Sequence, residues 1–230
     1  MKISQEFSKY AKSYGIYNII QNRVIKHLKS KLPKDKVKNI LDLGCGSGSL
    51  CKAIEYEHFV GVDFAKGMLE LHPKAKNIEC IYGDFNDDAL FEKLKKYKYD
   101  LVLSASALQW AKDLEKVFVN IKALDAPVAL AIFTSGTFET LNKTAALEPM
   151  LKSAEYIQEL QKKYFDSDFE VVRYKLEFES NLEMFRYIKR SGVSASRKVL
   201  NYKQTKDLIK SYPLNYLEFE VVFITSFSRS

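Results

Sequence analysis

The sequence of 230 residues predicts a single α/β domain with a doubly wound, seven-stranded and mostly parallel sheet. First, five short segments are apolar throughout and alternate with helical segments, which is typical of parallel strands buried on both faces. Second, two long segments near the C-terminus alternate between apolar and polar residues, as strands with one exposed face do. Third, the length is within reach of one domain of up to about 250 residues. The right-handed crossover rule then places helices on both faces of the sheet.

The first part of the chain supplies the predicted parallel strands. Apolar side chains recur near a 3.6-residue period over residues 4–32 and predict an N-terminal helix. The strands are expected at 38–43, 59–62, 78–82, 99–104 and 127–134. The helices between them are expected at 49–55, 66–71, 88–96 and 113–124.

The regular alternation stops after the fifth strand. Residues 136–165 are rich in lysine and show helical but no strand patterning, and we interpret them as a small inserted helical lid. The two long strands follow at 169–179 and 216–227, with helices at 181–190 and 203–211 between them. We expect the last strand to be antiparallel, which gives the sheet a mixed edge.

Composition leaves the choice of partner open. The chain has 36 basic and 29 acidic residues, for a net charge of +7, which favours nucleic acid, a membrane surface or an acidic carrier protein. The lysines are dispersed, so a solvated lysine-rich surface explains the charge equally well. There is no apolar stretch of 18 residues and no apolar segment at the N-terminus. We therefore expect a cytoplasmic protein with three reduced cysteines, no membrane span and no metal site.

A glycine cluster follows the first predicted strand. Gly44, Gly46 and Gly48 lie between a strand and a helix, where glycine permits positive φ and lets backbone N–H groups approach a ligand. Asp63 ends the second strand, and a carboxylate there can accept hydrogen bonds from two ribose hydroxyls. A turn that serves only packing is the alternative interpretation.

The spacing of this loop distinguishes between nucleotide cofactors. The pattern is G-x-G-x-G, with Ser49 directly after the last glycine, whereas dinucleotide sites use G-x-G-x-x-G. Asp42 precedes the loop, and its carboxylate would repel a pyrophosphate and attract an ammonium group. S-adenosylmethionine carries an ammonium and a sulfonium but no phosphate, so the pattern predicts this cofactor.

Further residues are expected around the adenine. Asp84 follows the third strand and can accept from the adenine amino group, with Phe85 covering the ring. Phe64 and Met68 can cover the other face, although for each residue taken alone ordinary core is the favoured interpretation. The complete set of cofactor-binding candidates is Asp42, Gly44, Cys45, Gly46, Gly48, Asp63, Phe64, Met68, Gly83, Asp84, Phe85 and Ser104.

The sequence resembles class I methyltransferases, and more narrowly the malonyl-acyl-carrier-protein O-methyltransferases of biotin synthesis. The glycine loop LDLGCGSG is common to many methyltransferases, whereas the Leu-Gln-Trp triplet of YDLVLSASALQW (99–110) narrows the resemblance. TSGTFETL (134–141) and RYIKRSGVSASR (186–197) resemble later segments of that family. Two features depart from it: residues 123–127 replace its usual K-P-G-G turn, and residues 136–165 are short for its lid.

This resemblance implies methyl transfer from S-adenosylmethionine to the free carboxylate of a malonyl thioester, on an acidic acyl-carrier protein or on coenzyme A. A carboxylate is already ionised at neutral pH, so no general base is required. Residues 104–110 accordingly contain no His, Asp or Glu. Tyr14 is the candidate to close over the methyl group, and Gln109 and Trp110 are candidates to shape the acceptor pocket. Trp110 can equally be a core anchor.

The charged groups for this substrate remain open. Arg23, Arg190 and Arg197 are candidates to bind the carboxylate. Candidates to dock an acidic carrier are Lys143, Lys152, Lys162, Lys163, Arg186, Lys189 and Arg190. Alternative functions are a methyltransferase of RNA or of a small metabolite, and a non-catalytic S-adenosylmethionine-binding partner protein. Against RNA, the sequence shows no platform of basic and aromatic residues.

Overall fold

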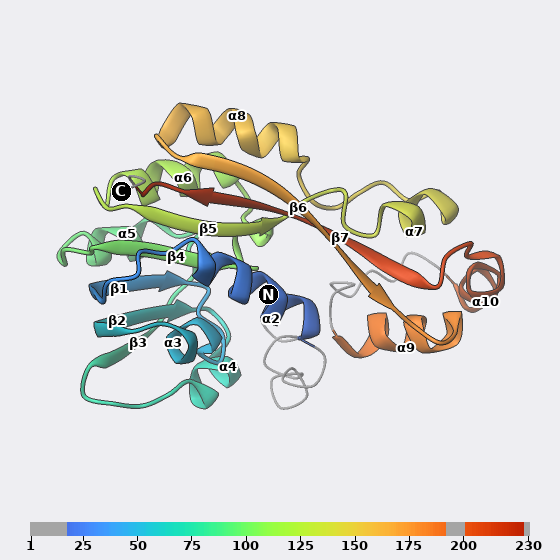
Figure 1. Cartoon of the computed structure of the whole chain (residues 1–230), viewed down its shortest axis with the longest axis horizontal. Helices are drawn as coiled ribbons and strands as arrows, with labels where there is room; N and C mark the ends of the chain where they lie inside the picture. Colours follow the sequence, from blue (N-terminus) through green and yellow to red (C-terminus); the bar gives the residue numbers. More distant parts are fainter. Residues whose placement is uncertain (1–17, 192–200, 228–230) are drawn as a thin grey trace.

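The computed structural model describes residues 18–191 and 201–227 and contains a seven-stranded sheet with the order β3-β2-β1-β4-β5-β7-β6 (Figure 1). The strands are β1 (Val37–Leu43), β2 (Tyr56–Asp63), β3 (Ile78–Tyr82), β4 (Leu101–Ala105), β5 (Val128–Phe133), β6 (Asp168–Glu177) and β7 (Tyr216–Thr225). β1 to β5 pair in parallel, and β7 is antiparallel to both of its neighbours. The predicted doubly wound, mostly parallel sheet is confirmed.

Helices cover both faces of the sheet. They are α2 (Ile19–Ser30), α3 (Ser49–Ala53), α4 (Lys66–Leu71), α5 (Asp88–Leu94), α6 (Leu114–Lys122), α7 (Glu139–Thr144), α8 (Ala154–Tyr164), α9 (Asn181–Ser191) and α10 (Tyr202–Ser211), with a short 3-10 turn η1 (Leu108–Trp110). One core cluster joins the sheet to α5, α6 and α8, and the other joins it to α2, α3 and α9. Residues 18–32 of the predicted N-terminal helix 4–32 can be compared, because residues 1–17 lie outside the described part, and α2 covers Ile19–Ser30 of them.

The position of the last strand refines the prediction of a mixed edge. β7 is antiparallel as expected, but it lies between β5 and β6, so that β6 is the edge strand. Burial explains the order, because β7 is buried along most of its length whereas β6 is largely exposed or half-buried. The more apolar strand therefore takes the position with a neighbour on each side. Both strands extend beyond the others towards α9 and α10 (Figure 1).

The lid interpretation of residues 136–165 stays a prediction, and the packing of α8 favours a narrower range. α8 packs against α6 and against the β6–β7 pair, with Ile157 fully buried and Leu160 5% exposed. α8 is therefore part of the layer that covers the sheet, and only residues 136–153, which include α7, remain as a predicted lid. No helix in the described ranges is long and apolar enough to cross a membrane.

Candidate functional site

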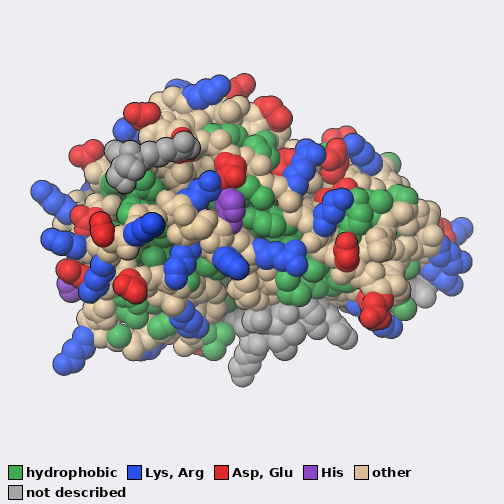
Figure 2. Space-filling view, in the orientation of Figure 1, with side chains coloured by type: hydrophobic (Ala, Val, Ile, Leu, Met, Phe, Trp, Pro, Cys, Tyr) green, Lys and Arg blue, Asp and Glu red, His purple; other side chains and the backbone are tan. Residues whose placement is uncertain are grey.

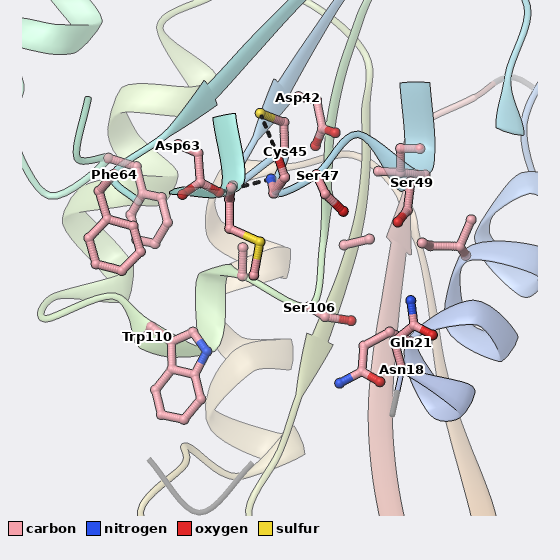
Figure 3. Close-up of a pocket in the computed structure, with 18 residues that line it drawn as sticks. Asn18, Gln21, Asp42, Cys45, Ser47, Ser49, Asp63, Phe64, Ser106 and Trp110 are labelled. Carbon is pink, nitrogen blue, oxygen red and sulfur yellow. Dashed lines mark hydrogen bonds between the residues drawn. The ribbon is translucent and has the colours of Figure 1, made fainter. Parts of the chain in front are cut away.

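A pocket opens at the carboxyl ends of β1, β2 and β4, where an open α/β sheet is expected to bind its ligand. α2 and the segment that follows β4 complete its walls (Figure 3). The lining residues are Asn18, Gln21, Ile25, Asp42, Gly44, Cys45, Gly46, Ser47, Ser49, Leu50, Asp63, Phe64, Met68, Phe85, Ala105, Ser106, Ala107 and Trp110. Nine of the predicted site residues are among them: Asp42, Gly44, Cys45, Gly46, Asp63, Phe64, Met68, Phe85 and Trp110.

The glycine loop turns sharply because Gly44, Gly46 and Gly48 all have positive φ, at 79°, 52° and 79°. The N–H groups of Gly44 and Cys45 both donate to the carbonyl of Val62, at 2.8 and 3.0 Å, which ties the loop to β2. A Cβ on Gly44 would overlap that of Ala107 on the opposite wall. Glycine at position 44 therefore lets the loop after β1 lie directly against the loop after β4.

Gly48 has a packing role. It does not line the pocket, and a Cβ there would approach Pro73 Cδ to 2.5 Å and the ring of His72 to 2.9 Å. Gly48 immediately precedes α3, so it lets the start of that helix fit against the loop after α4. Its contact with the cofactor stays a prediction.

Asp63 connects the two strand ends on which the cofactor is expected. Its Oδ2 accepts from Gly46 N–H and its Oδ1 from Ala65 N–H, both at 2.8 Å (Figure 3). Burial raises the pKa of Asp63, and the backbone hydrogen bonds oppose that rise. Each carboxylate oxygen can accept a second hydrogen bond. Asp63 can therefore hold the glycine loop and still accept from ribose hydroxyls.

Asp42 is a buried acid that has no partner among the described residues. It is 1% exposed, and neither carboxylate oxygen accepts a hydrogen bond from residues 18–191 or 201–227. Burial, and secondly repulsion from Asp63, raise the pKa of Asp42 well above its ordinary value. An unpaired buried carboxylate is costly, and a cation beside it removes the cost. The pocket therefore fits a ligand with an ammonium group, as S-adenosylmethionine has.

Apolar residues form the wall beside Asp63. Phe64, Met68 and Phe85 line the pocket, and Met68 and Phe85 are 3% and 7% exposed. They provide a flat apolar surface suited to an adenine ring. Gly83 and Asp84 do not line the pocket.

Gly83 and Asp84 have local structural roles instead. The N–H of Gly83 donates to the carbonyl of Asp63 at 3.1 Å, and Asp84 Oδ1 accepts from the backbone N–H and the side-chain amide of Asn86, at 2.9 and 2.7 Å. Their contact with adenine stays a prediction.

The segment after β4 forms the opposite end of the pocket. Ser106 and Trp110 line it, whereas Ser104 and Gln109 do not. Ser104 Oγ donates to the carbonyl of Leu43 at 2.7 Å and ties β4 to β1. Gln109 Nε2 donates to the carbonyl of Ser106 at 2.7 Å, so Gln109 shapes the pocket only by holding that loop. Tyr14 lies outside the described residues.

Several lining residues were not predicted. They are Asn18, Gln21, Ile25, Ser47, Ser49, Leu50, Ala105, Ser106 and Ala107. Gln21 carried a readable signal, because it follows the buried Ile20 and lies four residues before Ile25 on the same helix. Ser106 carried no signal of its own.

Of the candidate cations for the substrate, Arg23 is the one whose side chain the structure describes, and it does not line the pocket. Arg23 Nη1 donates to the carbonyl of Lys175 at 2.9 Å, on the side of α2 that faces β6. The side chain of Arg190 and the whole of Arg197 lie outside the described part of the chain. No Lys, Arg or His belongs to the lining within residues 18–191 and 201–227.

The strand order, the glycine loop after β1 and the acids at the ends of β1 and β2 define a class I methyltransferase fold. The family model described as "Methyltransferase domain" matches residues 34–172, and the chain belongs to this family. The enzyme is an S-adenosylmethionine-dependent methyltransferase.

Individual proteins support this assignment. Malonyl-[acyl-carrier protein] O-methyltransferase 2 of Ilyobacter polytropus is 26% identical, over 98% of this chain and 94% of its own length. The YcgJ protein of Bacillus subtilis superposes with a TM-score of 0.58 at 13% identity, over 90% of this chain and 99% of that protein.

A third protein has been solved with the cofactor. Phosphoethanolamine N-methyltransferase 2 of Haemonchus contortus, in complex with S-adenosyl-L-methionine, has a TM-score of 0.53 at 20% identity, over 92% of this chain and 53% of that one.

Proposed function

We propose that the enzyme transfers the methyl group of S-adenosylmethionine to the free carboxylate of a malonyl thioester, carried by an acyl-carrier protein or by coenzyme A. The product is a methyl ester, and the resemblance to the enzymes of biotin synthesis assigns it to the priming of biotin precursors. The name of the Ilyobacter relative supports this acceptor.

One observation of the pocket carries the proposal. Among the described residues, the titratable ones that line it are Asp42, Cys45 and Asp63, and all three belong to the strand ends and loop proposed for the cofactor. The described lining at the other end, around Ser106 and Trp110, contains no acid, histidine or lysine. An amine or hydroxyl acceptor must lose a proton, and a nearby base assists that step. An ionised carboxylate has no proton to lose and needs no base.

The cofactor, when bound, supplies an activated methyl group on a sulfonium. Asp42 would hold its ammonium group and Asp63 its ribose, while Phe64, Met68 and Phe85 cover the adenine. Trp110 and Ser106 then border the remaining space. The contribution of these residues is alignment and exclusion of water, which is worth up to about 7–11 kcal/mol in favourable systems.

The ion pairs and exposure of the lysines reduce the number of candidate contacts for an acidic carrier. Among the lysines predicted to dock it, Lys143 pairs with Glu139 and Lys163 pairs with Glu115, both at 2.5 Å. Lys152 lies over the ring of Tyr156, 5.4 Å from its centroid, and Lys152 and Lys162 are exposed. We propose Lys152, just before the start of α8, and Lys162, near its end, as contacts of the carrier.

Mass spectrometry after incubation with isotopically labelled cofactor tests the acceptor. The substrates are malonyl-carrier protein, malonyl-coenzyme A, acetyl-carrier protein and bulk RNA. We expect the label on both malonyl thioesters and on neither of the others, because acetyl has no free carboxylate. Asp42→Asn should lose the activity, and the exposed Asp166→Asn should keep it. Label on RNA, or on acetyl-carrier protein, would overturn the proposal.

A further inference from the structure

Buried polar atoms without partners gather at the acceptor end of the pocket. Gln21 Oε1, Ser106 Oγ and Gln109 Oε1 are all buried and have no hydrogen bond within the part of the chain that the structure describes. Gln21 and Ser106 line the pocket, from α2 and from the loop after β4. Figure 3 shows their side chains on the same side of the pocket, away from Asp63 and Phe64. Buried polar atoms are nearly always paired, so this pair indicates a polar ligand group between them.

The backbone holds Ser106 in an unusual conformation. Its φ is 60°, in the left-handed region that a serine rarely adopts. Its N–H donates to the carbonyl of Ala131 at 2.9 Å, and its carbonyl accepts from Gln109 Nε2 at 2.7 Å. Such a conformation is energetically unfavourable and persists where the surroundings enforce it. Here the two hydrogen bonds fix the residue whose hydroxyl lines the pocket.

The facing residues on α2 are also firmly placed. Ile20, Val24 and Leu28 are fully buried and attach the helix to the sheet. Asn18 Oδ1 accepts from Asn22 Nδ2 at 3.1 Å, so the N–H₂ group of Asn18 remains a donor for the pocket that it lines. A terminal amide also carries two N–H donors beside its oxygen, so Gln21 can donate as well as accept.

Neutral donors suit an anionic nucleophile. A lysine or arginine would hold a carboxylate strongly but would also stabilise the charge that has to attack. Amide and hydroxyl groups fix the position of the carboxylate with less loss of nucleophilicity. The described lining offers only such neutral donors at this end of the pocket.

We infer that Gln21 and Ser106 form a neutral hydrogen-bonding subsite that holds the acceptor carboxylate. This inference rests on the proposed function and names residues for its acceptor. The subsite binds one carboxylate oxygen, and the other attacks the methyl carbon. A carbon–oxygen bond forms, the carbon–sulfur bond breaks, and its electron pair returns to sulfur as a neutral thioether. No proton is released, and Gln109 is a positioning residue for Ser106.

Calorimetric binding of malonyl-pantetheine to the enzyme saturated with S-adenosylhomocysteine tests the subsite without turnover. We expect Gln21→Ala to raise the Kd about tenfold or more, as for a lost hydrogen bond to a charged group. Ser106→Gly removes the hydroxyl and relieves the positive φ, so it should give a similar loss in a fully folded protein. Gln21→Glu should weaken binding further by charge repulsion.

Matched measurements separate the subsite from a structural role. Lys26→Ala, at an exposed position of the same helix, should leave the Kd unchanged. The affinity for S-adenosylhomocysteine should be the same in all variants. Acetyl-pantetheine, which lacks the carboxylate, should bind equally to the wild type and the variants. The inference would be overturned if Gln21→Ala lost affinity for S-adenosylhomocysteine but kept its affinity for malonyl-pantetheine in the ternary mixture. That result would assign Gln21 to the cofactor.

A methylation assay with S-adenosylmethionine, run beside the calorimetry, distinguishes the two proposals. Methylation of malonyl thioesters by a Gln21→Ala enzyme with unchanged KM and kcat overturns the subsite and leaves the proposed function standing. Binding of malonyl-pantetheine that depends on Gln21, without methylation by the wild type, supports the subsite and overturns the proposed function. If the wild type neither binds malonyl-pantetheine nor methylates malonyl thioesters, both proposals are overturned.

Discussion

At the scale of single residues, Asp42 is the residue on which the proposed cofactor site depends most. Its carboxylate is buried, lines the pocket and has no partner among the residues that the structure describes. Asp63 is nearby and adds repulsion. The free protein therefore bears a cost at this position that only a cation or a proton can remove.

The first prediction concerns the pH dependence of stability without cofactor. Because burial raises the pKa of Asp42 well above 3.8, the folded protein keeps a proton that the unfolded chain releases above this value. Stability therefore falls as pH rises from 3.8 through the raised pKa. Asp42→Asn removes this loss, so the Tm of the variant should gain on that of the wild type with rising pH. A constant difference in Tm would contradict the prediction.

The affinity for the cofactor should also depend on the ionisation of Asp42, but it should rise with pH where the stability falls. Ionised Asp42 is the form that attracts an ammonium, so wild-type affinity for S-adenosylmethionine should rise with pH through that window. Asp42→Asn should weaken binding by about ten- to a hundredfold, the value of a hydrogen bond between charged groups. Calorimetry across the pH range measures both effects. Equal affinity in the variant would exclude Asp42 from the cofactor site.

The glycine loop gives a second prediction, on stability. Gly44→Ala places a Cβ against that of Ala107 at a positive φ, and it should cost about 2–4 kcal/mol. Gly46→Ala has the same type of backbone strain but open space around the new Cβ, and it should cost only about 1–2 kcal/mol. Urea denaturation of the two variants compares them. Equal losses would mean that Gly44 does not set the approach of the two loops.

Local patterns account for the part of the site that the sequence predicts. Asp42, Gly44 and Asp63 follow directly from strand ends, since the carboxyl ends of parallel strands meet at one edge. Ser104 and Gln109 are close in sequence to residues that line the pocket, but neither lines it. Their side chains instead donate hydrogen bonds to the carbonyls of Leu43 and Ser106, respectively. Such bonds depend on tertiary contacts and have no signature in a strand or helix period.

At the scale of elements, the chain after β5 differs most from its prediction. α8 shows lysine-rich helical patterning, yet its apolar side chains face the sheet. A surface helix and a mobile lid share the same amphipathic pattern, so the pattern alone cannot separate them. The position of β7 inside the sheet likewise could not be predicted from a local pattern, because it depends on which strand pairs bury the most apolar surface.

The third prediction tests this assignment of α8. Ile157→Ala should lower the free energy of unfolding by about 2–5 kcal/mol, because it leaves a cavity in the core. Met150→Ala, at an exposed side chain in the remaining lid segment, should change it by less than about 0.5 kcal/mol. Chemical denaturation gives both values. If Ile157→Ala changed the free energy of unfolding only slightly, the interpretation of residues 136–165 as a lid would be favoured again.

At the scale of the whole molecule, charge is spread widely. Figure 2 shows lysine and arginine side chains interspersed with acidic ones over the visible face. The net charge of +7 favours an acidic partner over long distances.

The fourth prediction uses the salt dependence of this attraction. The KM for malonyl-carrier protein should rise several-fold between about 0.01 M and about 1 M salt, as the Debye length falls from about 30 Å to about 3 Å. Lys152→Glu with Lys162→Glu should produce a similar rise at low salt. The KM for malonyl-pantetheine should respond to neither. Equal responses of both substrates would exclude carrier docking on α8.

The most direct measurement follows the fate of the transferred methyl group. Wild-type enzyme is incubated with methyl-labelled S-adenosylmethionine and malonyl-carrier protein, and the product is then treated with mild alkali. A carboxyl methyl ester releases its label as methanol, whereas methyl groups on nitrogen or on a ribose hydroxyl are retained. We predict incorporation into the malonyl group followed by complete release. Absence of label from the malonyl thioester, or label that resists alkali, would contradict the assignment of a carboxylate acceptor.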